Sequence, residues 1–188
     1  LSSATQPYAA FKGPNKVLYR QEFPLRFFQP APNYHDYKHI YSFQNDMEQF
    51  EDTWAFWTDL KHKLREFDFK SYGVGCDDGK IYPKVYFHLR MADATFIVQS
   101  KGPWEGYGHI IHNAMAIGRP MIVKFSDYQG KLAEPLLIKD QTYLDMDDPD
   151  IMVDELVDTE LHTAFTQHTV IPISPELLKQ LKGEQNER

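Results

Sequence analysis

Residues 101–109 combine a positive charge with three glycines, and this chemistry suits a site for a phosphorylated ligand. Lys101 supplies the charge, and Gly106 and Gly108 allow a ligand to approach the backbone closely. A helix that begins after these glycines presents amide groups that can bind an anion. The same stretch also holds four aromatic or polar side chains, Trp104, Glu105, Tyr107 and His109. The alternative is that the glycines only form a tight turn and that the tryptophan only fills a core.

The segments on either side predict how this stretch is positioned. Residues 94–98 form a short apolar run that is typical of a buried strand. From Tyr107 onwards, apolar residues recur at helical spacing until Gly118, which is placed to end the helix. Residues 121–123 form a second buried strand. The unit is a strand, loop, helix and strand, and in open α/β sheets ligands bind where loops follow the carboxyl ends of strands.

Gly75 lies in a second glycine-bearing loop, at residues 73–79, after a strand predicted at residues 69–74. Because the carboxyl ends of parallel strands meet at one edge of a sheet, Gly75 is expected to line the same crevice. The loop is no dinucleotide fingerprint, because a third glycine and its helix are out of register. The neighbouring Cys76 is predicted to be a small buried residue rather than a nucleophile.

The segment WEGYGHIIHNAMAIGRPMIV, residues 104–123, resembles the donor-binding segment of the second Rossmann domain in glycosyltransferases of the GT-B type, in particular the retaining, group-1-like members. The matching residues, in order, are Glu105, Gly106, Tyr107, Gly108, Ala114, Met115, Ala116, Gly118, Arg119 and Pro120. The resemblance implies a Rossmann-like parallel sheet with helices on both faces, one half of a GT-B architecture. It also implies transfer of a sugar from a nucleotide-diphosphate sugar to an acceptor, and a preceding Rossmann domain.

The resemblance also implies roles for individual residues. The candidate catalytic residues are Glu105, which would hold sugar hydroxyls, and His109, which would donate a hydrogen bond to the ligand. Lys101 and the amides that open the helix would stabilise the leaving diphosphate. The expected ligand-binding set is Lys101, Trp104, Gly106, Tyr107, Gly108, Asn113 and Gly75, in which Asn113 contacts the ribose and an aromatic ring supplies a stacking face. The nucleotide sugar is the substrate, and no cofactor is expected.

Two positions depart from the family pattern. Asn113 stands where the retaining members carry a second glutamate, and the loop at residues 42–46 lacks the arginine and lysine that many relatives carry after the first strand. Diphosphate binding would then depend more on Lys101 and Lys131. Two alternatives therefore stay open: a non-catalytic glycosyltransferase-like module that binds a nucleotide or a protein, and an epimerase-type enzyme that acts on nucleotide sugars.

A metal site is the less favoured interpretation of the histidines in this segment. His109 and His112 lie three residues apart beside Glu105, and such a set can bind zinc. The zinc motif with two histidines four residues apart is absent, however, so no metal is expected. The acidic residues at 145–150 lack the pattern of a calcium loop and predict a solvated face.

Strands and helices alternate over most of the 188 residues, which suits one α/β domain. We expect an N-terminal arm or connector at residues 1–38, either a hinge or a surface wrap, a Rossmann-like domain at 39–182 and a disordered tail at 183–188. Within the domain the patterns predict a strand at 39–44, a helix at 47–67 capped by Asn45 or Asp46, and a last strand at 136–138. A short helix is predicted at 82–92, with Val85, Tyr86, Leu89 and Met91 turned inward.

Composition limits the expected partners and location. The formal net charge of -7 argues against a nucleic-acid partner. No apolar run approaches the roughly 20 residues that cross a bilayer. A single cysteine cannot form an internal disulfide, which favours a reducing compartment, and so we expect a cytoplasmic protein.

Overall fold

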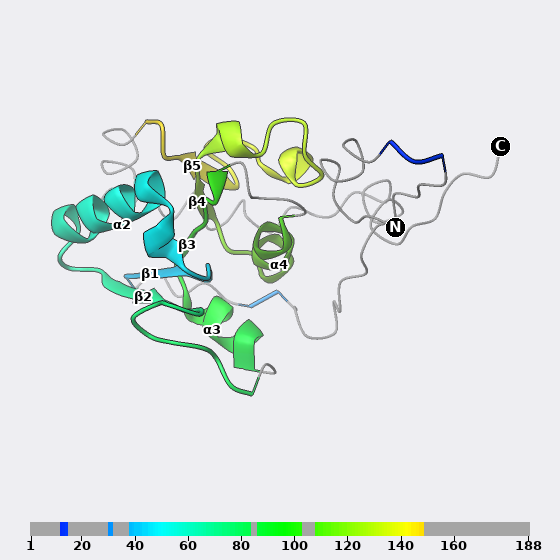
Figure 1. Ribbon diagram of the computed structural model, residues 1–188. Helices are drawn as coiled ribbons and strands as arrows, with labels where there is room; N and C mark the ends of the chain where they lie inside the picture. The colour runs from blue at the N-terminus through cyan, green and yellow to red at the C-terminus, as the bar shows by residue number, and fades with distance from the viewer. Residues whose placement is uncertain (1–11, 15–29, 32–37, 84–85, 103–107, 149–188) are drawn as a thin grey trace.

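Five short parallel strands, in the order β2-β1-β3-β4-β5, form the centre of the computed structural model, which describes residues 12–14, 30–31, 38–83, 86–102 and 108–148 (Figure 1). The strands are β1 (His39–Ser42), β2 (Asp68–Ser71), β3 (Phe96–Val98), β4 (Met121–Val123) and β5 (Tyr143–Asp145). Every pair of neighbouring strands is parallel. The predicted Rossmann-like parallel sheet is therefore confirmed.

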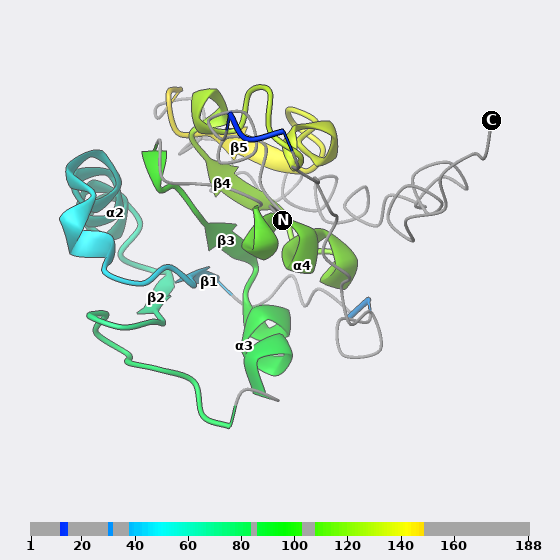
Figure 2. The same cartoon turned by 45° about the vertical axis from the view of Figure 1, so that its right-hand side comes forward.

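Helices cover both faces of this sheet, as predicted. α2 (Glu51–Lys63) lies on one side of the strands, and α3 (Phe87–Asp93) and α4 (His109–Ile117) lie on the other (Figure 2). Three 3-10 turns complete the described elements: η1 (Met47–Gln49), η4 (Phe125–Asp127) and η5 (Glu134–Leu136). In that described part of the chain, no helix is both long and apolar enough to traverse a bilayer.

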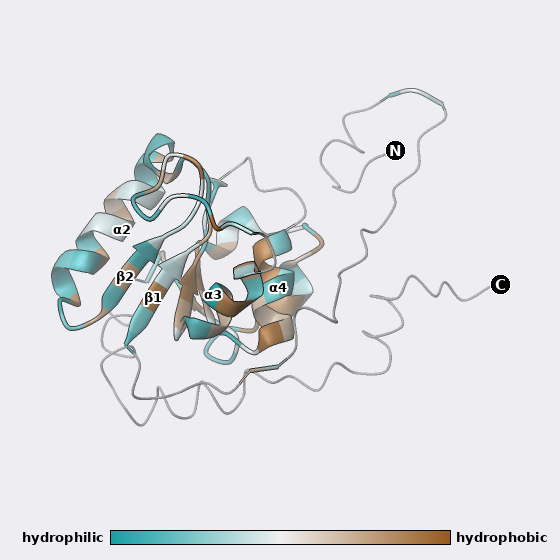
Figure 3. Ribbon diagram, turned by 90° about the horizontal axis from the view of Figure 1, so that it is seen from below, coloured by the Kyte–Doolittle hydropathy of each residue, from teal (hydrophilic) through white to brown (hydrophobic). Residues whose placement is uncertain are grey.

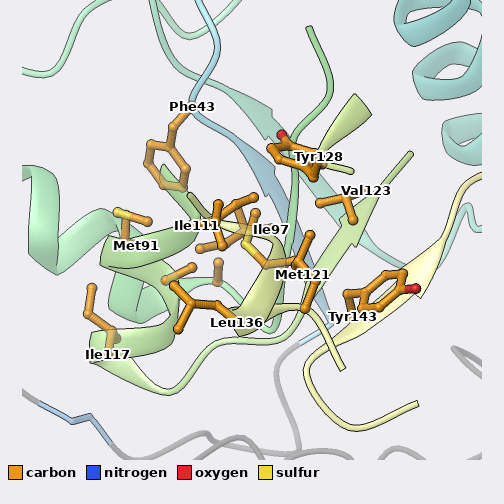
Figure 4. Packing of buried hydrophobic residues seen from close by; sticks show 14 of the residues in the cluster. Phe43, Met91, Ile97, Ile111, Ile117, Met121, Val123, Tyr128, Leu136 and Tyr143 are labelled. Carbon is orange, nitrogen blue, oxygen red and sulfur yellow. The ribbon is translucent and has the colours of Figure 1, made fainter. Parts of the chain in front are cut away.

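Alternation of side chains along the strands gives each face its own core. Ile40, Phe96 and Ile122 point towards α2, where they meet Trp57 and Leu60. The intervening positions point to the opposite face, and Figure 4 shows Ile111 of α4 beside Ile97 and Met121 of the sheet. The hydropathy colouring of Figure 3 shows brown, hydrophobic strands next to β1, whereas β1 and the edge strand β2 are largely teal and α2 is mostly hydrophilic. Strands buried on both faces account for the continuous apolar runs in the sequence.

The strand order creates a topological switch point between β1 and β3. From β1 the chain passes through α2 to β2, which lies on one side of β1. From β2 it passes through α3 to β3, which lies on the other side of β1. The loops that follow β1 and β3 therefore diverge at the carboxyl edge. In open α/β sheets, ligands bind where such loops diverge. The fold itself therefore identifies the residues after Ser42 and after Val98 as the candidate ligand site.

The helices are shorter than their periodicity predicts. The expected helix at residues 47–67 is instead η1 followed by α2, because Phe50 between them has a non-helical backbone (φ -104°, ψ 89°). Neither expected cap is used: Asp46 is left-handed (φ 51°), and Asn45 Oδ1 accepts a hydrogen bond from the Val74 amide at 2.9 Å. Trp57, Leu60 and Leu64, which follow one another at helical spacing, are buried.

The helix predicted at residues 82–92 begins later, at Phe87, and this shift changes which side chains face inward. Met91 is fully buried, as predicted. Tyr86 and Leu89 are 49% exposed, so the prediction for these two residues was wrong. Phe87 packs against the core instead. Val85 lies outside the described residues.

The last strand was also misplaced. Residues 136–138 belong to a turn, because the Leu137 amide donates to Glu134 O (2.9 Å) and the Ile138 amide donates to Thr142 Oγ1 (2.8 Å). The fifth strand is β5, and its last residue, Asp145, is the first of the acidic residues that were predicted to form a solvated face. Leu144, on this strand, is 2% exposed and packs in the α2-side core. The predicted second strand is likewise shorter than expected and ends at Ser71.

Candidate functional site

Hydrogen bonds join the loops at the carboxyl edge of the sheet. After β1, Gln44 Oε1 accepts from the Ser100 amide, which follows β3, at 3.2 Å. Ser100 Oγ in turn donates to Asp127 Oδ2, which follows β4, at 2.6 Å. Three polar residues from three strand ends therefore meet across the switch point, and Gln44 and Ser100 are almost completely buried.

The loop after β2 is held against the loop after β1. The Asp46 amide donates to Val74 O at 2.7 Å, and Cys76 Sγ donates to Gln44 O at 2.9 Å. Gly75 has φ +67°, and a Cβ at this position would lie 2.7 Å from Asp46 Oδ1. The close approach that requires glycine here is to the protein's own Asp46, so the pairing of the two loops is sufficient to explain Gly75.

Lys101 lies directly after the buried Ser100, at the point where the chain leaves the sheet. Its side chain is partly exposed, and it forms no ion pair with any residue in the described ranges. Lys124, by contrast, lies 3.6 Å from Asp52 and 3.8 Å from Asp147. The structure therefore places Lys101 at the carboxyl edge of the sheet, with a charge that no described carboxylate neutralises.

Lys131 is the second cation near this edge. It is only 9% exposed, and its Nζ lies 6.0 Å from the ring centroid of Tyr128. The Tyr128 hydroxyl donates to Gln99 O, at the end of β3, with a distance of 3.4 Å. Two residues after Lys131, the methyl group of Ala133 lies against Gly108, which is the N-cap of α4. Lys131 thus belongs to a segment that packs beside the start of α4.

α4 begins with Gly108 in the left-handed conformation (φ 74°, ψ 40°) and ends at Gly118 in the same conformation, as predicted. His109 is exposed at its first position, and Asn113, one turn later, is 9% exposed. Residues four apart share a helix face, so these two predicted ligand contacts lie one turn apart on the same side of α4. The first amides of α4 lie at the carboxyl edge beside them, which suits an anion.

His112 has a structural position. Its Nδ1 lies 2.9 Å from Gly108 O, so the buried ring is held against the start of its own helix. Across the part of the chain that the structure describes, no group of three or more histidine, cysteine or acidic side chains is arranged to hold a metal ion. The predicted contacts Trp104, Glu105, Gly106 and Tyr107 lie outside the described residues.

Arg119, which matches the family pattern, is structural rather than exposed to a ligand. It is 1% exposed, and its guanidinium donates to Ala92 O (2.6 and 3.1 Å), Ala31 O (3.0 Å) and Gly118 O (3.2 Å). Burial is the dominant effect and lowers the pKa of Arg119 to about 10, although the nearby carboxylate of Asp93 acts in the opposite direction. The side chain therefore joins the connector at Ala31 to the end of α3.

Sequence reasoning missed the bonds that connect the strand ends. Gln44, Ser100 and Thr53 were assigned no role, although each is buried and polar. The available signal was the position of Gln44 and Ser100, because each is a polar residue two positions after the end of a strand. Only the strand order, which places β1 beside β3, shows that these two residues meet.

Comparisons with known proteins agree with this fold. No protein-family model matches the chain, and neither does any curated protein sequence. Among solved structures, an S. aureus TarM variant in complex with fondaparinux, α-GlcNAc-glycerol and UDP matches 95% of this chain and 41% of its own, with a TM-score of 0.60 and 14% identity. Anabaena HepE in complex with UDP-glucose matches 89% of this chain and 56% of its own, with a TM-score of 0.55 and 10% identity.

The chain therefore spans about half the length, or less, of these solved structures. At such low identity the likeness concerns the fold alone. That fold is a Rossmann-like five-stranded parallel sheet with helices on both faces.

Proposed function

We propose that this chain binds a nucleotide-diphosphate sugar at the carboxyl edge of its sheet and is the donor-binding domain of a glycosyltransferase. The observation that carries the proposal is the placement of Lys101 and the α4 N-terminus at the β1–β3 switch point. Both features favour negative charge, and a Rossmann-like sheet binds its ligand at this edge. The ligands named for TarM and HepE include UDP and UDP-glucose, which are of the proposed class.

In the proposed complex the positive groups act on the diphosphate. Glycosyl transfer leaves negative charge on the departing nucleotide, and preorganised donors stabilise that charge as it develops. Lys101 and the first amides of α4 would take this role, with Lys131 as a second cation. His109 would donate to the sugar or phosphate, Asn113 would contact the ribose, and Glu105 would bind sugar hydroxyls. This scheme requires no protein nucleophile.

A non-catalytic nucleotide-binding module is the second candidate, and one observation favours it. The loop after β1 carries Asp46 in place of a basic pair, and its Gln44 carboxamide is bound to Ser100. This loop therefore offers no cation to a diphosphate. Such a module would bind the nucleotide without transferring a sugar, so binding alone does not separate the two candidates.

Titration calorimetry with a panel of nucleotide sugars tests the shared binding step. We expect one or more members to bind with a dependence on the diphosphate, and Lys101→Ala to weaken that binding by about tenfold, the effect of one charged hydrogen bond. Lys80→Ala is the matched control, since this exposed lysine lies in the β2–α3 connection and has no proposed role. Absence of binding by every member would reject the proposal. Binding without glycosyl transfer or sugar release in the full-length protein would favour the module.

A further inference from the structure

Ser100 is bonded through all three of its polar groups, each to a different element. Its amide donates to Gln44 Oε1 (3.2 Å) after β1, and its carbonyl accepts from Thr53 Oγ1 (3.0 Å) on α2. Its hydroxyl donates to Asp127 Oδ2 (2.6 Å) in η4. Ser100 is only 2% exposed. The chain is therefore fixed against three separate elements immediately before Lys101.

Asp127 holds the chain on both sides of Lys101. The same Oδ2 atom that accepts from Ser100 Oγ also accepts from the Gly102 amide at 3.0 Å. Gly102 has φ +56°, so the backbone turns sharply at this point. A single carboxylate oxygen thus bridges residues 100 and 102, and it determines where the intervening lysine leaves the backbone.

We infer that Asp127 is a positioning residue: through Ser100 and Gly102 it fixes Lys101 at the switch point, where the lysine meets the phosphate groups of the donor. The ligand part of this inference rests on the proposed function. Oδ2 already accepts from two protein donors, so in this inference the carboxylate acts on Lys101 through the loop.

The sign of the effect distinguishes this inference from simple electrostatics. Asp127 is negatively charged and lies at the edge proposed to bind phosphate, so through-space repulsion alone predicts that its removal strengthens anion binding. A positioning role predicts the opposite, because the lysine loses its fixed place. The two explanations therefore give changes in affinity of opposite direction for the same substitution.

The test compares Asp127→Ala, Asp127→Asn and Ser100→Ala in the full chain. UDP affinity is measured by calorimetry, and amide exchange at Lys101 and Gly102 is measured by NMR without ligand. We expect Asp127→Ala to weaken UDP binding about tenfold and to speed Gly102 exchange by a similar factor, the effect of losing bonds to a charged acceptor. Asp127→Asn, which keeps an acceptor oxygen, should weaken UDP binding less than Asp127→Ala does. Ser100→Ala removes only the hydroxyl bond and keeps the two backbone bonds.

Asp148→Ala is the matched control, because it removes the same charge from an exposed carboxylate that pairs with Lys139, at 3.5 Å. It should leave UDP affinity and Gly102 exchange unchanged. Unchanged or tighter UDP binding by Asp127→Ala would overturn the inference, and so would unchanged Gly102 exchange. If the wild-type chain binds neither UDP nor any nucleotide sugar, the proposed function fails and the ligand part of this inference fails with it. The other part of the inference, that Asp127 holds the backbone of residues 100–102 in place, is tested separately by the amide exchange of Gly102.

Discussion

At the scale of single residues, Arg119 shows how a motif position can serve the fold. Its guanidinium is buried and donates to the backbone carbonyls of Ala31 and Ala92. The sequence pattern predicted its place after the glycine that ends α4, but not its partners. Those partners are Ala31 and Ala92, which are far from Arg119 in sequence, so no local pattern could have revealed them.

Arg119→Met should lower the free energy of unfolding by about 3 kcal/mol, because the buried carbonyl oxygens of Ala31, Ala92 and Gly118 lose their donor. Denaturant unfolding measures this change. Arg90→Met is the control, since Arg90 is half-exposed and pairs with Asp93 at the surface, at 3.4 Å. It should cost less than about 1 kcal/mol. Equal effects of the two substitutions would contradict the structural role of Arg119.

Cys76 offers a prediction about pH. Burial raises the pKa of its thiol, and backbone hydrogen bonds from Met47 and Asp46 only partly offset this effect. The thiolate is the reactive form, so the rate of alkylation should reach its midpoint at a higher pH in the folded protein than in urea. The pKa is higher when folded, so the thiol's contribution to stability is complete below the unfolded pKa and is lost as pH rises through the folded pKa.

The chain has one cysteine, so the urea-unfolded protein is its own reference in this experiment. Iodoacetamide labelling followed by mass spectrometry across alkaline pH gives both midpoints. A folded midpoint at or below the unfolded midpoint would show that burial does not control this thiol.

At the scale of elements, a helix with apolar periodicity and a terminal glycine was predicted well, whereas a short strand was not. α4 was predicted from its apolar spacing and from Gly118, and the structure confirms it. β5 has three residues, Tyr143–Asp145, which is too short for an alternating pattern, and aspartates surround it. Its identity comes from pairing with β4, a tertiary contact that propensity does not report.

Gly108 at the start of α4 is predicted to be intolerant of any side chain. It has φ +74°, and a Cβ would lie 2.6 Å from the Ala133 Cβ. Gly108→Ala should therefore lower the free energy of unfolding by about 2–4 kcal/mol, from backbone strain and overlap together. Gly130→Ala separates the two causes, because Gly130 has φ +70° but a Cβ there would meet no described atom within 4 Å. That control should cost only about 1 kcal/mol.

Thermal or denaturant unfolding of both variants checks this prediction. The double variant Gly108→Ala with Ala133→Gly should recover part of the loss, because the second change removes the overlapping methyl group. If Gly108→Ala costs no more than Gly130→Ala, the close packing of residues 131–133 against α4 is wrong.

At the scale of the whole molecule, alternation of strands and helices was sufficient to predict the parallel sheet and its two covered faces. The strand order was not predicted, and with it the meeting of Gln44, Ser100 and Asp127 at the switch point. Residues 44, 100 and 127 are separated by whole βα units, so only the topology brings them together. Lys101 and Gly108 could be singled out as candidate ligand contacts because they are local features of the sequence. The bonds that hold the carboxyl edge in place come from distant segments.

The most direct test of the central claim is to map UDP-glucose binding on the backbone amides by two-dimensional NMR. We expect saturable shifts at Lys101, Gly102, His109 and Ile110, which lie at the carboxyl edge of the sheet. Thr95 and Thr142, which precede β3 and β5 at the opposite edge, should not move. Shifts confined to the opposite edge, or no saturable shift with UDP-glucose or any other nucleotide sugar, would contradict the claim that a sugar donor binds at the switch point.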